Sequence, residues 1–130
     1  MRDRVQFQTR MFNTTEVKPH FINPRCFGED LAEWIGRRLS GESVSCGSPF
    51  QEDWGWNVPV EVGRSKFFIN IGLMDEPSEA PTWLVWVESR GLVSRLFRSR
   101  SAGPQNVLCQ RLGDILASAS EISHVQWSAA

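Results

Sequence analysis

The stretch Glu52-Asp53-Trp54-Gly55-Trp56-Asn57-Val58-Pro59-Val60-Glu61-Val62 decides how the rest of the chain is interpreted. From Trp54 to Val62, large apolar residues occupy every second position, which is typical of a strand with one buried face. The pattern predicts a strand over residues 54–62, with the indoles of Trp54 and Trp56 on one face. Gly55, between the indoles, leaves room for backbone or a ligand to approach the other face closely.

Proline inside a strand restricts where that strand can lie. Pro59 has no backbone N–H to donate to a neighbouring strand. The strand over 54–62 is therefore predicted to lie at a sheet edge or to carry a bulge near its middle.

Two carboxylates, Glu52 and Asp53, stand at the entrance of this strand, where a buried aromatic floor would meet water. One interpretation is structural: they cap a turn or pair with an arginine. The other is functional: they bind or react with something. In an extended chain they point to opposite sides, which is poor geometry for a shared acid and base.

Periodicity predicts the remaining elements. Alternating apolar residues indicate further strands over 5–11, 44–46, 66–73 and 122–127. The run over 83–87 is apolar on both faces, which predicts a central strand covered on both sides. Helical spacing indicates helices over 29–39, 92–97 and 107–116, with a break at Gly103-Pro104 before the last. Short turns between successive strands favour antiparallel pairing. We therefore expect an α+β fold in two layers, with a mainly antiparallel sheet of about five or six strands and two or three helices on one face.

Length and composition indicate one globular domain over residues 1–130. Apolar residues make up 41% and charged residues 22%, which argues against a disordered or fibrous chain. There are six Trp and eight Phe but no Tyr, so a few large rings can anchor the core.

Three cysteines, Cys26, Cys46 and Cys109, form no C-x-x-C pair, which argues against a disulfide framework and a structural zinc site. The segment Met1-Arg2-Asp3-Arg4 lacks the apolar run of a signal peptide, and the longest apolar stretch, 83–87, is too short to cross a bilayer. We expect a cytoplasmic protein that does not insert into membranes.

Charge is unevenly spread although the net charge is only −1. Residues 29–88 hold eleven acids and four bases, a balance of −7, and residues 89–113 hold five arginines and no acid. This asymmetry predicts either internal pairing or a surface with two poles. Without an overall basic excess, nucleic-acid binding is not favoured. The predicted basic surface consists of Arg90, Arg95, Arg98 and Arg100.

No reaction motif is present: the chain has no G-x-S-x-G, H-E-x-x-H, phosphate-binding loop or dinucleotide fingerprint. Lone His20 has no partner at metal-ligand spacing, so a hydrogen-bonded or surface histidine is the favoured interpretation. The acids of 74–81 match no calcium loop. Thiol catalysis by Cys26 or Cys46 with His20 or His124 would need these residues to meet in space. We predict no cofactor and no metal.

Two segments, Cys26-Phe27-Gly28-Glu29-Asp30-Leu31 and Pro49-Phe50-Gln51-Glu52-Asp53-Trp54-Gly55-Trp56, carry a family resemblance. The chain resembles small uncharacterised bacterial proteins with a Gly-Glu-Asp helix start and a Glu-Asp-Trp-Gly-Trp strand, over residues 21–100. The resemblance implies a bacterial source and no established activity. Together, the two motifs predict that four acids, Glu29, Asp30, Glu52 and Asp53, gather at one end of the sheet.

These observations lead to the hypothesis of a non-enzymatic protein-binding or self-associating module, because aromatic rings and arginine are typical interface anchors. We expect a protein partner, or a second copy of the chain bound through the strand edge at Pro59 or through the face of Trp86. The alternatives are a small-ligand-binding protein or enzyme that uses Glu52 and Asp53 beside an indole wall, and an immunity-type or inhibitor-type protein whose acidic surface masks a basic target. The predicted binding residues are Glu52, Asp53, Trp54, Trp56, Glu29 and Asp30.

Overall fold

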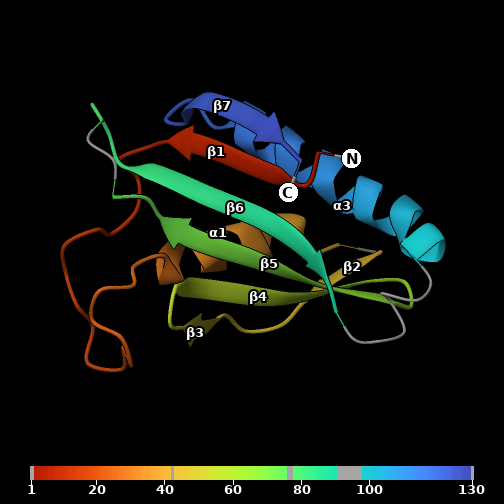
Figure 1. The fold of residues 1–130 in the computed structure, drawn as a ribbon, viewed down its shortest axis with the longest axis horizontal. Coiled ribbons are helices and arrows are strands. Elements are labelled where there is room, and N and C mark those ends of the chain that lie inside the picture. The colour runs from red at the N-terminus through yellow and green to blue at the C-terminus, as the bar shows by residue number, and fades with distance from the viewer. Residues whose placement is uncertain (1, 42, 76–77, 91–97, 130) are drawn as a thin grey trace.

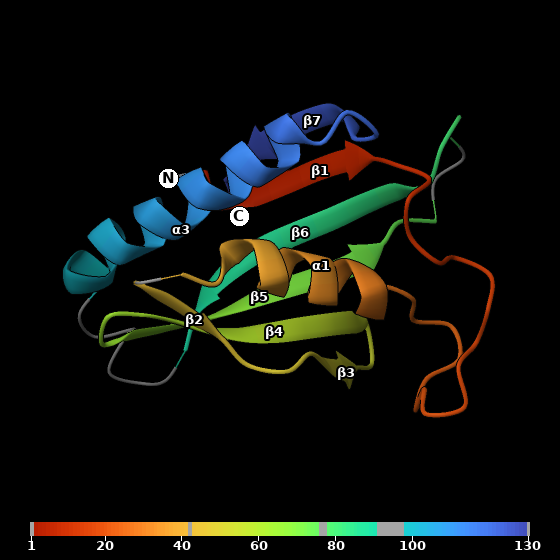
Figure 2. The same ribbon diagram turned by 180° about the vertical axis from the view of Figure 1, so that it is seen from behind.

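A single antiparallel sheet carries two helices on one of its faces (Figure 1). The computed structural model describes residues 2–41, 43–75, 78–90 and 98–129, with the backbone alone for 98–102. Figure 2 shows helices α1 and α3 in front of the sheet, and Figure 1 shows the opposite face with neither helix before it. The α+β architecture with helices on one face is as predicted.

Seven strands form the sheet in the order β2-β4-β5-β6-β1-β7, with β3 also pairing with β4. The sheet is larger than predicted because the three-residue β3 is too short to show alternation. The predicted central strand over 83–87 lies within β6, between β5 and β1. The elements are β1 (Arg4–Gln8), α1 (Glu29–Leu39), β2 (Val44–Cys46), β3 (Phe50–Glu52), β4 (Gly55–Val62), β5 (Ser65–Leu73), β6 (Thr82–Ser89), α3 (Arg98–Ser118) and β7 (Ser123–Ser128).

The helix predicted over 29–39 is confirmed as α1, which has the expected charge pattern and apolar stripe. Acids in the first turn and arginines in the last turn both suit the helix dipole. A Cβ at Gly36 would lie 3.8 Å from Cys46 Cβ and 3.9 Å from Val58 Cγ1, which is ordinary contact, so the packing of α1 does not require glycine there. The buried stripe that faces the sheet consists of Leu31, Ala32, Trp34, Ile35 and Leu39.

Helix α3 includes the predicted helix over 107–116 but begins at Arg98 and runs through Pro104. The predicted break at Gly103-Pro104 is therefore wrong. Proline inside a helix removes one hydrogen bond and crowds the carbonyl four residues earlier, but side chains further along anchor this helix to the core: Leu108, Cys109, Leu112 and Leu116 are all buried. The predicted helix over 92–97 lies outside the described residues. In the part of the chain that the structure describes, no helix has both the length and the apolar character needed to cross a membrane.

The core lies between the helices and one face of the sheet. Every second residue of the central strands points into it, as the period of two requires. The sheet residues at this face are fully enclosed: Val5, Phe7, Val58, Val60, Phe67, Ile69, Ile71, Trp83 and Val85 are each 0% exposed.

Pro59 lies in the second strand from the edge, and its outer neighbour is interrupted beside it. Strand β2 ends at Cys46, opposite Val60, and β3 begins at Phe50, opposite Asn57. In the gap between them, the N–H of Gly47 donates to the Pro59 carbonyl at 2.8 Å. Strand β4 is therefore not the outermost strand. Pro59, which lacks an N–H, lies opposite the gap between β2 and β3, where no strand residue needs that donor.

Candidate functional site

The motif Glu52-Asp53-Trp54-Gly55-Trp56 forms a tight hairpin between β3 and β4. Glu52 pairs with Gly55, which leaves Asp53 and Trp54 as the two turn residues. Gly55 is required by close approach, since a Cβ built there would lie 2.1 Å from the Ile71 carbonyl oxygen. The backbone at Gly55 therefore lies closer to β5 than a residue with a Cβ atom would allow.

Trp56 is part of the core. It is 3% exposed, and its Nε1–H donates to the Cys26 carbonyl at 2.9 Å. Its ring lies 5.3 Å from that of Phe21, centroid to centroid. Trp56 therefore ties β4 to the loop that precedes α1.

Trp54 lies on the other face of the sheet, so the prediction of both indoles on one face is wrong. It is a turn residue and not the first residue of the strand, and the alternation that places Trp56 in the core begins only at Gly55. Trp54 is 45% exposed, and its ring packs on Trp86 with a centroid distance of 5.0 Å. Trp54 is thus the only one of the two rings that a partner can touch.

The sheet face away from the helices carries a group of rings that we call the aromatic face: Phe50, Trp54, Phe68 and Trp86. Phe50 is 41% exposed, and its ring lies 6.0 Å from Phe68. The Arg90 guanidinium lies over the Phe68 ring, 4.6 Å from its centroid. No described helix covers this face (Figure 1). Two ring pairs from four segments of the chain therefore meet solvent together.

Two buried asparagines, Asn57 and Asn70, face each other across β4 and β5 in the floor of the aromatic face. Each is 3% exposed. Phe50 and Trp86 continue the same row across β3 and β6. Asn57 Nδ2 lies 3.4 Å from Glu52 Oε1, whereas Asn57 Oδ1 is buried without a hydrogen-bond partner. An unpaired buried oxygen costs free energy, so the floor is not optimised for stability alone.

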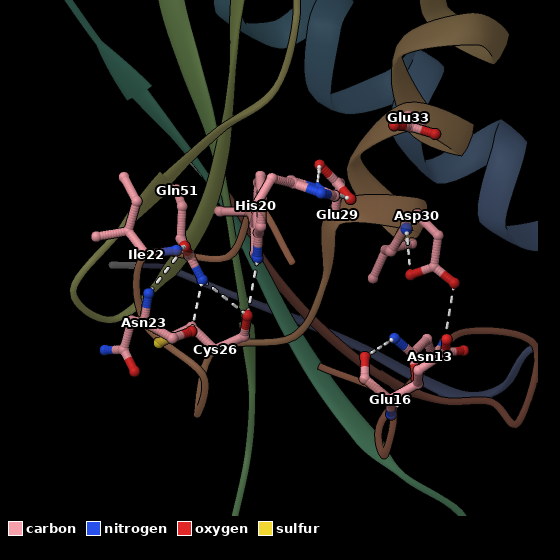
Figure 3. Close-up of polar contacts among 12 residues, drawn as sticks. Asn13, Glu16, His20, Ile22, Asn23, Cys26, Glu29, Asp30, Glu33 and Gln51 are labelled. Atoms are coloured by element: carbon pink, nitrogen blue, oxygen red, sulfur yellow. Dashed lines mark hydrogen bonds and ion pairs between the residues drawn. The ribbon is translucent and has the colours of Figure 1, made fainter. Parts of the chain in front are cut away.

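The loop before α1 is fastened to β3 by the side chain of Gln51 (Figure 3). Gln51 Oε1 accepts from the N–H groups of Ile22 and Asn23, and Gln51 Nε2 donates to the carbonyls of Asn23 and Cys26. Asn23 Nδ2 in turn donates to the Asp53 carbonyl at 3.1 Å. These bonds hold the hairpin turn in place from the core side.

The two acids at the start of α1, Glu29 and Asp30, each bond to a different residue (Figure 3). His20 Nε2 lies 2.6 and 2.7 Å from the two carboxylate oxygens of Glu29. Asp30 accepts a hydrogen bond from the Asn13 N–H at 2.8 Å. His20 is thus a hydrogen-bonded histidine, as favoured from the sequence, and both acids organise the loop before the helix.

The other two predicted acids belong to the hairpin. Glu52 is half-buried on the aromatic face beside Asn57, and Asp53 is exposed in the turn. The loop of residues 20–28 contacts the Glu29 carboxylate through His20 and the Asp53 carbonyl through Asn23. Asp30 instead bonds to Asn13, and Glu52 lies beside Asn57, so each acid has a different neighbour. Among the described residues, no group of three His, Cys, Asp or Glu side chains is placed to hold a metal ion.

All three thiols have a raised pKa. Burial raises the pKa of Cys26, and Asp53 adds to the effect. Burial also raises the pKa of Cys46, partly offset by the Ser40 hydroxyl. For Cys109, burial together with the Asp3 charge raises the pKa to about 11. Because the thiolate is the reactive form, these environments do not favour thiol catalysis.

Only part of the predicted basic surface can be placed. Arg90 is half-buried at the end of β6, against the aromatic face. Arg95 lies outside the described residues, and the side chains of Arg98 and Arg100, in the first turn of α3, are not described.

The aromatic face and its floor include four residues that sequence reasoning did not single out: Phe50, Phe68, Asn57 and Asn70. The face of Trp86 was predicted as a surface for a partner or a second copy. Phe68 and Trp86 both carry a sequence signal, because they stand on the second face of strands whose first face is already apolar. The remaining three depend on the hairpin register, which the sequence pattern does not show.

Comparisons of this chain with protein-family models, curated proteins and solved structures found no match.

Proposed function

We propose that this protein is a non-enzymatic binding module that engages a protein partner through the aromatic face. The observation that carries the proposal is the pair of exposed rings, Trp54 at 45% and Phe50 at 41%, on a sheet face that no described helix covers. Large rings beside arginine are characteristic of the centres of protein interfaces.

The polar surroundings support a mixed surface of this kind. Glu52 and Asn57 adjoin the rings, and Arg90 lies on Phe68. Along the neighbouring strands, exposed Glu61 and Lys66 form a loose ion pair at 3.9 Å. A rim of both signs around apolar rings suits a protein partner better than a polyanion, which requires an excess of positive charge.

The alternatives receive less support from this geometry. A small-ligand site or enzyme with Glu52 and Asp53 beside both indoles needs the two rings in one pocket, whereas Trp54 and Trp56 are on opposite faces of the sheet. An immunity-type or inhibitor-type role remains a special case of protein binding, in which Glu52 and exposed Asp53 would meet a basic target.

Site-specific photocrosslinking in the native cell tests the proposal. A benzophenone amino acid at position 54 or 50 should crosslink to one defined protein. The same group at position 17, where Val17 is 48% exposed in the loop before α1, serves as the matched control and should not. With the partner purified, Trp54→Ala should weaken binding on the order of 30-fold, because hot-spot rings contribute about 2 kcal/mol or more.

Two outcomes would contradict the proposal. One is crosslinking at position 17 to the same proteins as at position 54. The other is unchanged affinity of Trp54→Ala for the captured partner.

A further inference from the structure

Strand β7 (Ser123–Ser128) is the outermost strand of the sheet on the β1 side (Figure 1). It pairs with β1 through Arg4↔Ser128, Val5↔Trp127 and Gln6↔Gln126. No described strand pairs with its other side. An antiparallel edge strand presents about half of its backbone N–H and C=O groups outward, and these groups can accept another strand.

The common devices that block edge pairing are absent from most of β7. Its sequence, Ser-His-Val-Gln-Trp-Ser, has no proline, lysine or acid. The irregularity is confined to its beginning, where His124 has a φ of 56° and the register shifts between Gln6 and Gln8. By contrast, the opposite edge is divided into two three-residue strands with Gly47 and Pro49 between them. Residues 125–128 are therefore the more receptive edge.

Helix α3 lies along the same side of the molecule and offers a matching surface (Figures 1 and 2). A groove of about 310 Å³ lies between the helix and the strand, lined by Arg2, Cys109, Gln110, Gly113, Asp114 and Trp127. Gln110 and Asp114 are exposed residues of α3 that line this groove. Val107 and Ala117 are also exposed and continue the same row at helical spacing.

We propose that β7 pairs with β7 of a second copy of this chain, antiparallel across a two-fold axis, so that two sheets join into one. A second copy fits because the edge is self-complementary. Exposed Arg2 and exposed Asp114 line the same groove, so under a two-fold axis each copy presents a cation and an anion to the other. The edge strand itself carries no acid or lysine that its symmetry mate would repel.

The β7 edge is separate from the aromatic face, so dimerisation through β7 and partner binding through the aromatic face can be tested independently. Val125 is 38% exposed. Along the strand it points to the same face of the sheet as Trp127, the helix side, and Gln126 points to the opposite face. Substituting Val125 changes the edge without touching Trp54 or Phe50.

The test is the oligomeric state of the full chain by sedimentation across a concentration series. The wild type should dimerise, and Val125→Lys should weaken dimerisation on the order of tenfold, because lysine on an edge strand disfavours pairing with another strand. Val17→Lys is the matched control, because Val17 is similarly exposed and lies in a distant loop. It should dimerise like the wild type, as should Trp54→Ala.

Charge reversal supplies a second measurement. Arg2→Glu and Asp114→Lys should each weaken dimerisation, and the double variant should restore it. Amide exchange of β7 should slow as the protein concentration rises. The proposal is overturned if the chain stays monomeric at every concentration, if Val125→Lys and Val17→Lys dimerise alike, or if β7 amides gain protection only on adding a different protein.

Discussion

Gly55→Ala is the substitution that most severely tests the hairpin geometry. A Cβ at this position would lie 2.1 Å from the Ile71 carbonyl oxygen, whereas ordinary contact begins at 3.4 Å. Strands β4 and β5 must therefore separate by more than 1 Å beside the Trp56↔Ile71 pair. Lost ladder hydrogen bonds and backbone strain together predict a loss of roughly 3 kcal/mol in the free energy of unfolding.

Chemical denaturation followed by tryptophan fluorescence measures this loss directly, and thermal unfolding should show a drop in Tm of roughly 10 °C. Gly72→Ala is the matched control, because its Cβ would lie at an ordinary 3.6 Å from the Trp54 carbonyl oxygen. It should change the free energy of unfolding by less than about 1 kcal/mol. Equal stability of Gly55→Ala and the wild type, or an equal loss in both variants, would refute the reasoning.

Three further predictions concern buried groups. Trp56→Phe removes the hydrogen bond to the Cys26 carbonyl, so the free energy of unfolding from urea denaturation should fall by about 1–2 kcal/mol. An unchanged free energy of unfolding would contradict the contact. Asn57→Leu removes an unpaired buried oxygen and should raise the free energy of unfolding by about 1 kcal/mol in the same assay, while a loss would show that the oxygen is satisfied. Because burial and the Asp3 charge raise the pKa of the folded Cys109 thiol to about 11 from its ordinary value of 9.0, unfolding releases its proton above pH 9. Stability should therefore fall as pH rises from 9 to 11, and Cys109→Ala should flatten that fall; identical slopes for the two proteins would contradict it.

Local patterns in the sequence predicted most of the fold. Helix α1 was predicted from acids at its start, arginines at its end and an apolar stripe between them. Strands β4 and β5 were predicted from alternation, and β6 from a run that is apolar on both faces. Helix α3 was predicted too short because Pro104 looks like a stop in isolation, whereas packing of its later turns against the sheet outweighs one missing hydrogen bond.

The candidate site was harder to predict because it depends on register. Trp54 and Trp56 have the spacing of one strand face, and only the pairing of Glu52 with Gly55 shows that Trp54 belongs to a turn. A shift of one residue reverses which face a side chain occupies. The meeting of Trp54 with Trp86, and of Phe50 with Phe68, joins segments far apart in the chain, which periodicity within one segment does not reveal.

Fluorine NMR of protein labelled with 5-fluorotryptophan, with a soluble paramagnetic agent, tests the binding role of the aromatic face most directly. The six tryptophans give separate resonances that single Trp→Phe variants assign. In the free protein, the agent should broaden Trp54 and leave buried Trp56 and Trp83 sharp. In complex with the crosslinked partner, Trp54 should become protected. Continued broadening of Trp54 in the complex, or broadening of Trp56 in the free protein, would contradict the account.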